Sequence, residues 1–149
     1  LCLVGSEMCI RDRPEMMQAA PSYGFAPVEI YEFLEDRIEA ALAAGIPRER
    51  IAVDPGFGFG KTVQHNLALV NFAAMFHGLG VPVLIGVSRK SSIAAMSSGE
   101  DSDNRLAGSL GLAMATVVQG CQLLRVHDVA ETRQALAIQA ALADGADAG

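Results

Sequence analysis

Cysteines, basic residues and long hydrophobic runs are all scarce in this sequence. Only Cys2, Cys9 and Cys121 occur, and an odd, unevenly spaced set does not predict a disulfide framework. It is typical of a reducing compartment, so the cytoplasm is the expected location. Lysine and arginine number 11 against 17 acidic residues, and the net charge of -6 argues against a nucleic-acid partner. No run of about 18 uncharged apolar residues occurs, so we expect no membrane span.

The sequence does contain ample apolar material for one packed domain, since 51% of its 149 residues are hydrophobic. Three short runs rich in Val, Ile and Leu lie at 51–53, 82–87 and 122–126. They are bounded by Gly and Pro and separated by helical patterns. These features predict strands buried on both faces of a parallel sheet.

Helical periodicity fills the intervals between the strands. A helix is predicted over 28–45, where Ile30, Leu34 and Ile38 share one face and Gly45 follows the end. Further helices are predicted over 66–78, 105–120 and 129–145. The segment 105–120 is apolar and small nearly all round, which indicates packing on more than one side, against the sheet and against a second partner such as another subunit.

Alternating strands and helices predict an α/β fold, either an open doubly wound sheet or part of a (β/α)8 barrel. A complete barrel usually needs about 250 residues, so the barrel interpretation makes this chain roughly the second half of one, with parallel strands. Residues 1–13 fit the pattern poorly. We interpret them as an unassigned, non-native or scar segment, or alternatively as a degraded strand whose remnant is LCLV.

Each predicted strand delivers an ionisable group where it ends. Asp54 follows the first strand, Lys90 the second, and Arg125 and His127 the third. Ligands of parallel α/β sheets bind beyond the carboxyl ends of the strands. The four side chains are therefore expected at one rim of the sheet.

The glycine-rich segment 56–62, GFGFGKT, matches neither common phosphate-binding motif. A phosphate loop needs a glycine where Pro55 stands, and a dinucleotide fingerprint needs one where Lys61 stands. The segment is instead a loop that can bring backbone and an aromatic ring close to a flat ligand. The alternative is a tight turn with Phe57 and Phe59 both packed in the core.

Asp54 is expected at a partly buried strand tip, where its carboxylate needs a partner with two adjacent donors, such as a guanidino or amidine-like ring edge. The alternative is a turn cap formed with its own backbone. In SRKSS at 88–92, a strand-to-helix junction favours an anion. Lys90 is a candidate to enter the site, Ser91 can bind a carboxylate, and Arg89 can equally be a solvated surface charge.

The last strand alternates, so Arg125 and His127 share one side and together suit a phosphate or diphosphate. A core histidine bonded to backbone is the alternative for His127. Asp128, three residues before a glutamate, is interpreted as the cap of the final helix rather than as a catalyst. His65 and His77 have no metal-ligand spacing and are interpreted as surface or packing residues.

Four motifs together resemble the C-terminal half of the dihydropteroate synthase family, whose fold is a (β/α)8 barrel. They are DPGFGFGK at 54–61, GVSRKS at 86–91, NRLAGSL at 104–110 and RVHDV at 125–129. The segment 14–23 is also similar to the family. The resemblance therefore implies that 14–145 forms the C-terminal part of a pterin-binding domain, followed by a tail at 146–149.

The resemblance implies a folate-biosynthesis transferase that joins 6-hydroxymethyl-7,8-dihydropterin diphosphate to 4-aminobenzoate, giving 7,8-dihydropteroate and diphosphate. It also implies Mg²⁺, a homodimer formed through late barrel helices, and small-molecule substrates rather than nucleic acid or membrane. The implied catalytic residues are Lys90, Arg125 and His127, of which Arg125 and His127, with the metal, act by electrostatic stabilisation of the leaving group. The implied substrate-binding residues are Asp54 at the pterin edge, Phe59 and Lys90 at the aminobenzoate pocket, Ser91 at its carboxylate, Arg125 and His127 at the diphosphate, and Gly86 and Ser88.

The same resemblance implies parts that this sequence lacks: the first four strands with their pterin-contacting residues, the metal ligand, and two mobile loops. We therefore expect the 149 residues alone to be inactive or nearly so. Two other hypotheses stay open. One is a related pterin-binding barrel such as a methyltetrahydrofolate-corrinoid methyltransferase, and the other is a noncatalytic pterin-binding or dimerisation module.

Overall fold

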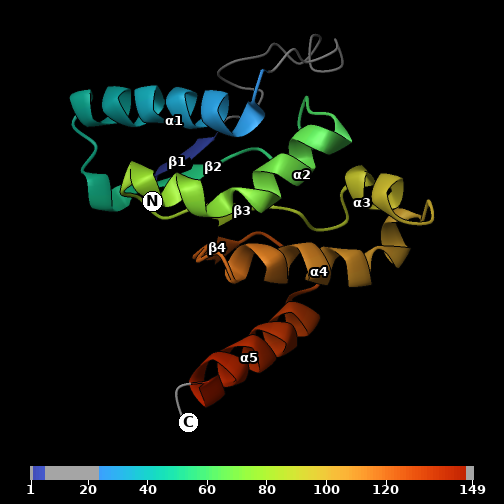
Figure 1. Ribbon diagram of the computed structural model, residues 1–149. Coiled ribbons are helices and arrows are strands. Elements are labelled where there is room, and N and C mark those ends of the chain that lie inside the picture. Colours follow the sequence, from blue (N-terminus) through green and yellow to red (C-terminus); the bar gives the residue numbers. More distant parts are fainter. Residues whose placement is uncertain (1, 6–23, 147–149) are drawn as a thin grey trace.

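Parallel strands lie side by side in chain order in the computed structural model, which describes residues 2–5 and 24–146 (Figure 1). The strands are β1 (Cys2–Gly5), β2 (Ile51–Asp54), β3 (Leu84–Ile85) and β4 (Leu123–Leu124). β1 pairs with β2 and β3 with β4, both in parallel. A parallel bridge from Val53 to Val83 links the two pairs, so the described strands follow the order β1-β2-β3-β4.

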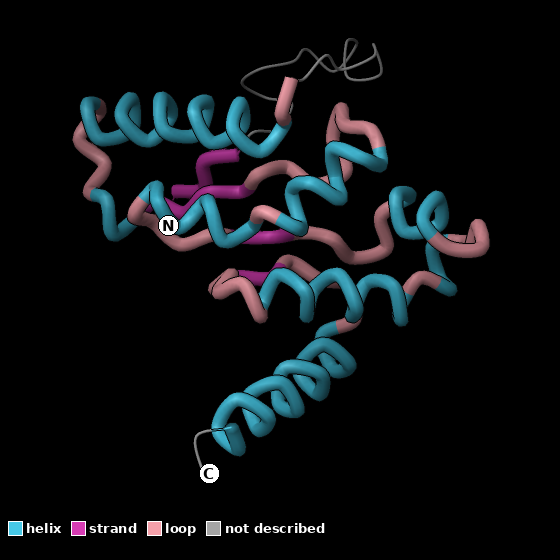
Figure 2. Tube along the Cα trace, viewed as in Figure 1, coloured by secondary structure: helices cyan, strands magenta, loops and turns pink. Residues whose placement is uncertain are grey.

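Helices fill the connections between these strands, as expected of an α/β fold. The α-helices are α1 (Ala26–Ala43), α2 (Val63–Asn71), α3 (Ser91–Met96), α4 (Leu106–Val117) and α5 (Val129–Ala146), and the 3₁₀ helices are η2 (Arg48–Arg50), η3 (Ala73–Leu79) and η4 (Ser102–Asn104). Figure 2 shows that the loops after β2 and β3 emerge at the same end of the sheet. No described helix is both long and apolar enough to cross a bilayer.

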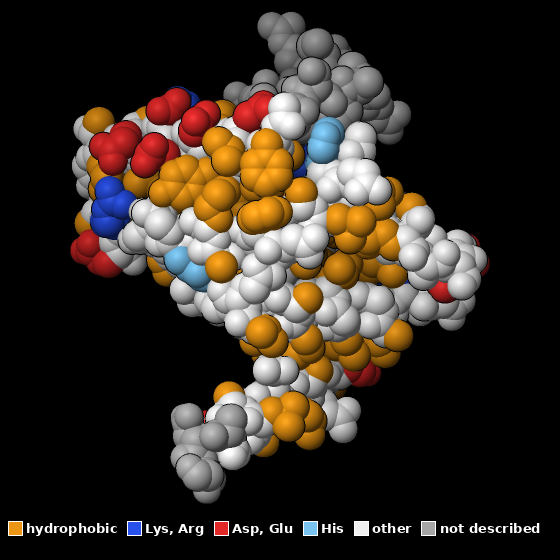
Figure 3. Space-filling view, viewed as in Figure 1, with side chains coloured by type: hydrophobic (Ala, Val, Ile, Leu, Met, Phe, Trp, Pro, Cys, Tyr) orange, Lys and Arg blue, Asp and Glu red, His pale blue; other side chains and the backbone are white. Residues whose placement is uncertain are grey.

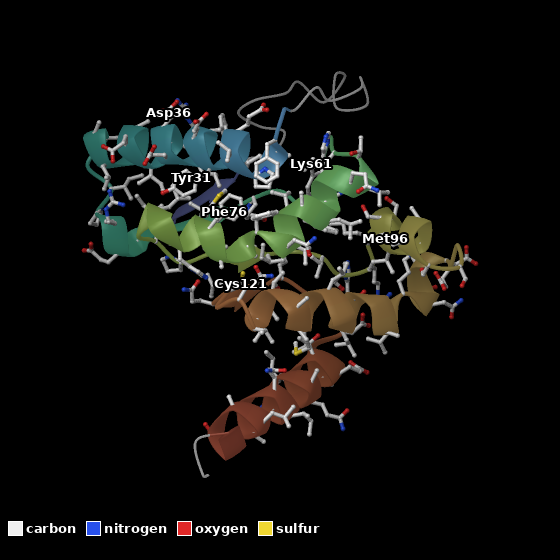
Figure 4. All side chains as sticks on the ribbon, in the orientation of Figure 1. Tyr31, Asp36, Lys61, Phe76, Met96 and Cys121 are labelled. Carbon is white, nitrogen blue, oxygen red and sulfur yellow. The ribbon has the colours of Figure 1, made fainter. Side chains whose placement is uncertain are left out.

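The core lies between β2 and the helices that cover it. Every residue of β2 is buried, which matches its unbroken apolar run. From α1, Ile30, Leu34 and Ile38 point into this core at helical spacing, while Figure 3 shows acidic side chains on the outer surface of α1. Tyr31 stacks on Phe76 of η3 with 6.4 Å between ring centroids (Figure 4). Each fully buried large side chain contributes roughly 1.5–3 kcal/mol.

The predicted helix over 28–45 is confirmed by α1. Gly45 follows its end with φ +86°, a left-handed conformation that glycine adopts without strain. The Ile46 N–H donates to the Ala41 carbonyl at 3.1 Å and closes the last turn. The prediction that Gly45 follows the end of this helix is therefore confirmed.

The continuous helix predicted over 66–78 is wrong, because the chain changes helix type at Phe72. The 3₁₀ helix η3 buries Ala73, Phe76 and Leu79, which are spaced three residues apart. A helix with three residues per turn places these three side chains on one face, whereas an α-helix would rotate them apart. Core packing therefore explains the change of helix type.

The structure decides between the two interpretations of residues 1–13 only for Cys2–Gly5. Cys2–Gly5 forms β1, paired with β2 from Cys2↔Ile51 to Gly5↔Asp54, so these four residues are a strand. The rest of the segment lies outside the described residues, as does most of the tail at 146–149. β3 and β4 are shorter than the runs that predicted them, although the Leu123 N–H still donates to the Val83 carbonyl at 3.1 Å.

Candidate functional site

The pairing register of β3 and β4 builds the centre of the site. Because Ile85 lies opposite Leu124, the next position places Gly86 beside Arg125. The Arg125 side chain lies directly across this glycine: a Cβ atom on residue 86 would stand 3.0 Å from its Nη2 and 3.1 Å from its Nε. Gly86 therefore provides the space that the guanidinium occupies.

Two positions further along, Ser88 and His127 join the strand tips. The Ser88 Oγ accepts the His127 backbone N–H at 3.2 Å and lies 2.9 Å from His127 Nδ1. Ser88 is buried, whereas His127 and Arg125 are exposed at the rim. Arg125 and His127 both line one cavity beyond the end of β4, as does Val126, which the predicted alternation placed on the other side. The core-histidine alternative is wrong, because the His127 ring lies at the surface and its partner is a side chain.

A cavity of about 490 Å³ opens between these tips. Its lining residues are Gly86, Ser88, Arg89, Lys90, Ser102, Arg125, Val126 and His127. Lys90 and Arg125, which are 35 positions apart in the sequence, thus face one space together. Cationic and hydroxyl donors dominate the lining, so the cavity suits an anion.

In the glycine-rich loop after β2, each of the alternatives that the sequence left open for Asp54 and for the two phenylalanines holds in part. Asp54 is 3% exposed, and its Oδ1 accepts the Gly56 N–H at 2.8 Å, so the turn-cap interpretation holds for one carboxylate oxygen. Phe57 is buried in the core, whereas Phe59 is only half-buried. The Lys90 Nζ lies 3.7 Å from the centroid of the Phe59 ring, a cation–π contact that joins the tips of β2 and β3.

Lys61 and Asn66 hold this loop, and sequence reasoning missed both. The Lys61 Nζ donates to the carbonyls of Gly56 and Phe59 at 2.8 and 3.1 Å. Asn66 is 1% exposed. Its Oδ1 accepts the Gly58 N–H at 2.8 Å, and its Nδ2 donates to the Ser92 Oγ at 3.0 Å. A single asparagine in a helical pattern gives no signal of this role, because its partners lie in other elements.

The interpretations of Arg89 and Asp128 are corrected. Arg89 is not simply a solvated charge: its Nε and Nη2 donate to the two carboxylate oxygens of Asp128 at 3.1 and 2.5 Å. Asp128 accordingly gives its side chain to Arg89 and not to the first turn of α5. The hydrogen bond from Arg89 holds the pKa of Asp128 below its usual range, and the same bond raises the pKa of Arg89.

The remaining histidines have structural partners, as expected. His65 exchanges hydrogen bonds with Thr62 in a capping box at the start of α2, and His77 Nε2 lies 2.9 Å from the Gln119 carbonyl oxygen. Within residues 2–5 and 24–146, no group of three or more His, Cys, Asp or Glu side chains could hold a metal ion. Mg²⁺ commonly takes one or two carboxylates together with substrate phosphates, so the Mg²⁺ that the resemblance implies stays a prediction.

Comparison with known proteins agrees with this geometry. Residues 7–127 match the family model described as pterin binding enzyme. The chain is 40% identical over 131 residues to dihydropteroate synthase of Escherichia coli K12, covering 88% of this chain and 46% of that protein. It is 41% identical to the dihydropteroate synthase of Neisseria meningitidis serogroup B, covering 91% and 48%. The chain thus spans about half the length of the curated relatives it matches.

Solved structures give the same result. The dihydropteroate synthase of Stenotrophomonas maltophilia superimposes with a TM-score of 0.88 at 37% identity, covering 94% of this chain and 52% of that one. The Thermus thermophilus enzyme in complex with 4-aminobenzoate gives 0.86 at 42% identity, covering 94% and 56%, and the Xanthomonas albilineans enzyme in complex with 7,8-dihydropteroate gives 0.81 at 43%, covering 84% and 48%. The fold is thus part of a (β/α)8 barrel, and the chain belongs to the pterin-binding enzyme family.

Proposed function

We propose that this chain provides the diphosphate, 4-aminobenzoate and part of the pterin contacts of a dihydropteroate synthase. The reaction breaks the bond between the pterin methylene carbon and the diphosphate oxygen and forms a bond from that carbon to the amine nitrogen of 4-aminobenzoate. The amine loses one proton, and diphosphate leaves. The observation that carries the proposal is the cationic cavity between β3 and β4, with Arg125 laid across Gly86 and His127 against Ser88.

The departing diphosphate is assigned to Arg125 and His127. A guanidinium offers two parallel N–H donors to phosphate oxygens. Ser88 engages Nδ1 of His127, which leaves Nε2 as the ring nitrogen that addresses an anion. Donors fixed in place before the reaction stabilise the charge that develops as the carbon–oxygen bond breaks. Arg125 and His127 then act as electrostatic catalysts, and no covalent intermediate is required.

The pterin ring edge is assigned to Asp54. Its carboxylate lies almost fully buried at the tip of β2, and an amino-pyrimidine edge offers two adjacent donors that match the two oxygens of a carboxylate. One turn hydrogen bond from Gly56 fixes its orientation. A carboxylate has about four acceptor positions, so this turn bond is compatible with paired donors from an amino-pyrimidine edge.

The 4-aminobenzoate pocket is assigned to Phe59, Lys90 and Ser91. Phe59 and Lys90 are already in contact and present an aromatic face and an alkyl chain to a flat ring. Ser91 is exposed at the first position of α3, where its hydroxyl can donate to a carboxylate. The same proposal places the protein in the cytoplasm as a homodimer formed through its later helices. Mg²⁺ stays an expectation from the resemblance, and no step is assigned to it.

Calorimetric titration of the 149-residue chain with diphosphate and with pterin diphosphate tests the proposal. We expect binding of both without turnover, and Arg125→Ala should weaken diphosphate binding at least about tenfold, the typical effect of losing a charge-assisted hydrogen bond. Arg133→Ala, which removes an exposed arginine of α5, is the matched control and should change binding less than about twofold. Absence of diphosphate binding, or equal effects of the two variants, contradicts the proposal.

A further inference from the structure

The segments that follow β3 and β4 are joined by side-chain contacts beyond the point where backbone pairing ends. The last hydrogen bond of the ladder is the Arg125 N–H to the Ile85 carbonyl at 2.9 Å. On the cavity side, Ser88 then contacts His127. The next residues along the two segments, Arg89 and Asp128, also contact each other, and Asp128 is not among the residues that line the cavity. Their bidentate ion pair is thus a second side-chain contact between the two segments, one residue beyond Ser88 and His127.

The backbone of Arg89, one member of this ion pair, is held in an unusual conformation. Its φ of +57° is the only positive value among the non-glycine residues that the structure describes, and such conformations persist only when surrounding contacts fix them. Two contacts do so here, one from Ser109 of α4 and one from Arg105, the residue before α4. The Arg89 N–H donates to the Ser109 Oγ at 2.9 Å, and the Arg89 carbonyl accepts from the Arg105 Nη1 at 3.1 Å.

Arg89 lines the cavity, but the two carboxylates that pair with its charge are not among the lining residues. Asp128 is the well-shielded partner, with 15% of its side chain exposed, and Asp103 is a second partner at 3.3 Å with 87% exposed. A bidentate pair with a shielded carboxylate fixes geometry, whereas a single contact with an exposed one contributes little. Asp128 can therefore fix the position of the Arg89 guanidinium, whereas Asp103 contributes little to it.

We propose that the Arg89–Asp128 pair is a positioning device that sets the His127 ring for anion binding, through the backbone that Asp128 shares with its neighbour. This inference rests on the proposed diphosphate site but assigns to Arg89 and Asp128 a positioning role that the proposed function does not give them. When the pair is intact, the two strand tips keep the separation that lets Ser88 reach both the backbone N–H and the ring of His127. When the pair is lost, the β4 tip moves and the ring loses its partner.

Nitrogen NMR of the His127 ring in the ligand-free chain tests this inference independently of any ligand. Asp128→Asn should shift the ring signals and remove the signature of the Ser88 contact. Asp103→Asn removes the same charge from the same arginine and should leave the signals unchanged. Unchanged signals in Asp128→Asn, or equal shifts in both variants, would overturn the inference.

Diphosphate titration supplies the second measurement. Asp128→Asn should weaken binding about tenfold, as happens when the partner that orients a metal-binding histidine is lost, and Asp103→Asn should stay within about twofold of the unaltered chain. Tighter binding by Asp128→Asn would overturn the inference, because it would mean that Asp128 only neutralises Arg89.

If Asp128→Asn does not fold, Arg89→Lys provides a second variant. It keeps the charge but loses the bidentate geometry, and it should show the same two changes. Normal ring signals and affinity in that variant would overturn the inference. If the unaltered chain does not bind diphosphate, the proposed function fails while the NMR comparison still decides this inference.

Discussion

Replacing Gly86 by alanine should damage the anion site without damaging the fold. A Cβ atom at this position would stand 3.0 Å from the Nη2 and 3.1 Å from the Nε of Arg125. Ordinary van der Waals contact begins at 3.4 Å, so the guanidinium must move by a few tenths of an ångström. Hydrogen bonds to a charged group contribute about 1.5–3 kcal/mol and depend on geometry. We therefore expect diphosphate affinity to fall about ten- to hundredfold.

Stability should change in the opposite direction. Gly86 has no positive φ, so alanine fits its backbone and restricts the unfolded chain, which stabilises a protein by about 0.4–1 kcal/mol. The matched control is Gly111→Ala on α4, where an added Cβ atom meets nothing within 4 Å. That variant should gain up to about 1 kcal/mol from helix propensity and bind diphosphate normally.

Calorimetric titration and urea unfolding of both variants provide the assay. Weak binding by a Gly86→Ala protein that unfolds at or above the usual urea concentration supports the geometry. Normal diphosphate affinity in Gly86→Ala would refute the reasoning, because Arg125 would then not need the space above this glycine. A parallel loss of affinity and stability would also refute it.

Two further predictions concern stability. Asn66→Ala should lower the free energy of unfolding by about 1–3 kcal/mol in urea titrations, since two partners in other elements lose their hydrogen bonds, whereas exposed Asn71→Ala should cost less than about 0.5 kcal/mol; similar costs would contradict the buried bridge. Burial raises the pKa of the Cys121 thiol from 9.0 to about 11, so the folded chain binds this proton more tightly than the unfolded chain. Its contribution is present below pH 9 and is lost as pH rises towards about 11. Cys121→Ala should therefore lose less stability than the unaltered chain over that range, and identical pH profiles would contradict the assignment.

Local patterns predicted the elements whose determinants are close together in the sequence. The helix over α1 and its glycine end followed from spacing within one segment, and so did the three strands after residue 50. The change to a 3₁₀ helix at Phe72 did not, because the preference for a period of three comes from the core that Ala73, Phe76 and Leu79 face. The helical pattern of the sequence predicted one continuous helix, and side-chain packing in the core decided that its second part is a 3₁₀ helix.

The candidate site divides in the same way. Chain order and parallel pairing were enough to bring Lys90, Arg125 and His127 to one rim, because the carboxyl ends of parallel strands meet at one edge. The roles of the individual residues stay predictions. The partners of Arg89 and Asn66 could not be predicted, since they lie 39 positions away for Asp128 and 26 for Ser92.

The sequence by itself determined which chemical groups stand at the strand ends and that these ends face one way, because apolar periodicity and strand alternation are local properties of a chain. Only the tertiary structure decided that Gly86 makes room for a guanidinium, that Ser88 holds a histidine ring, and that Arg89 pairs with Asp128 behind the cavity. These contacts depend on the register between two strands and on distances of a few tenths of an ångström. No pattern within one segment carries that information, because register is set by the packing of the whole sheet.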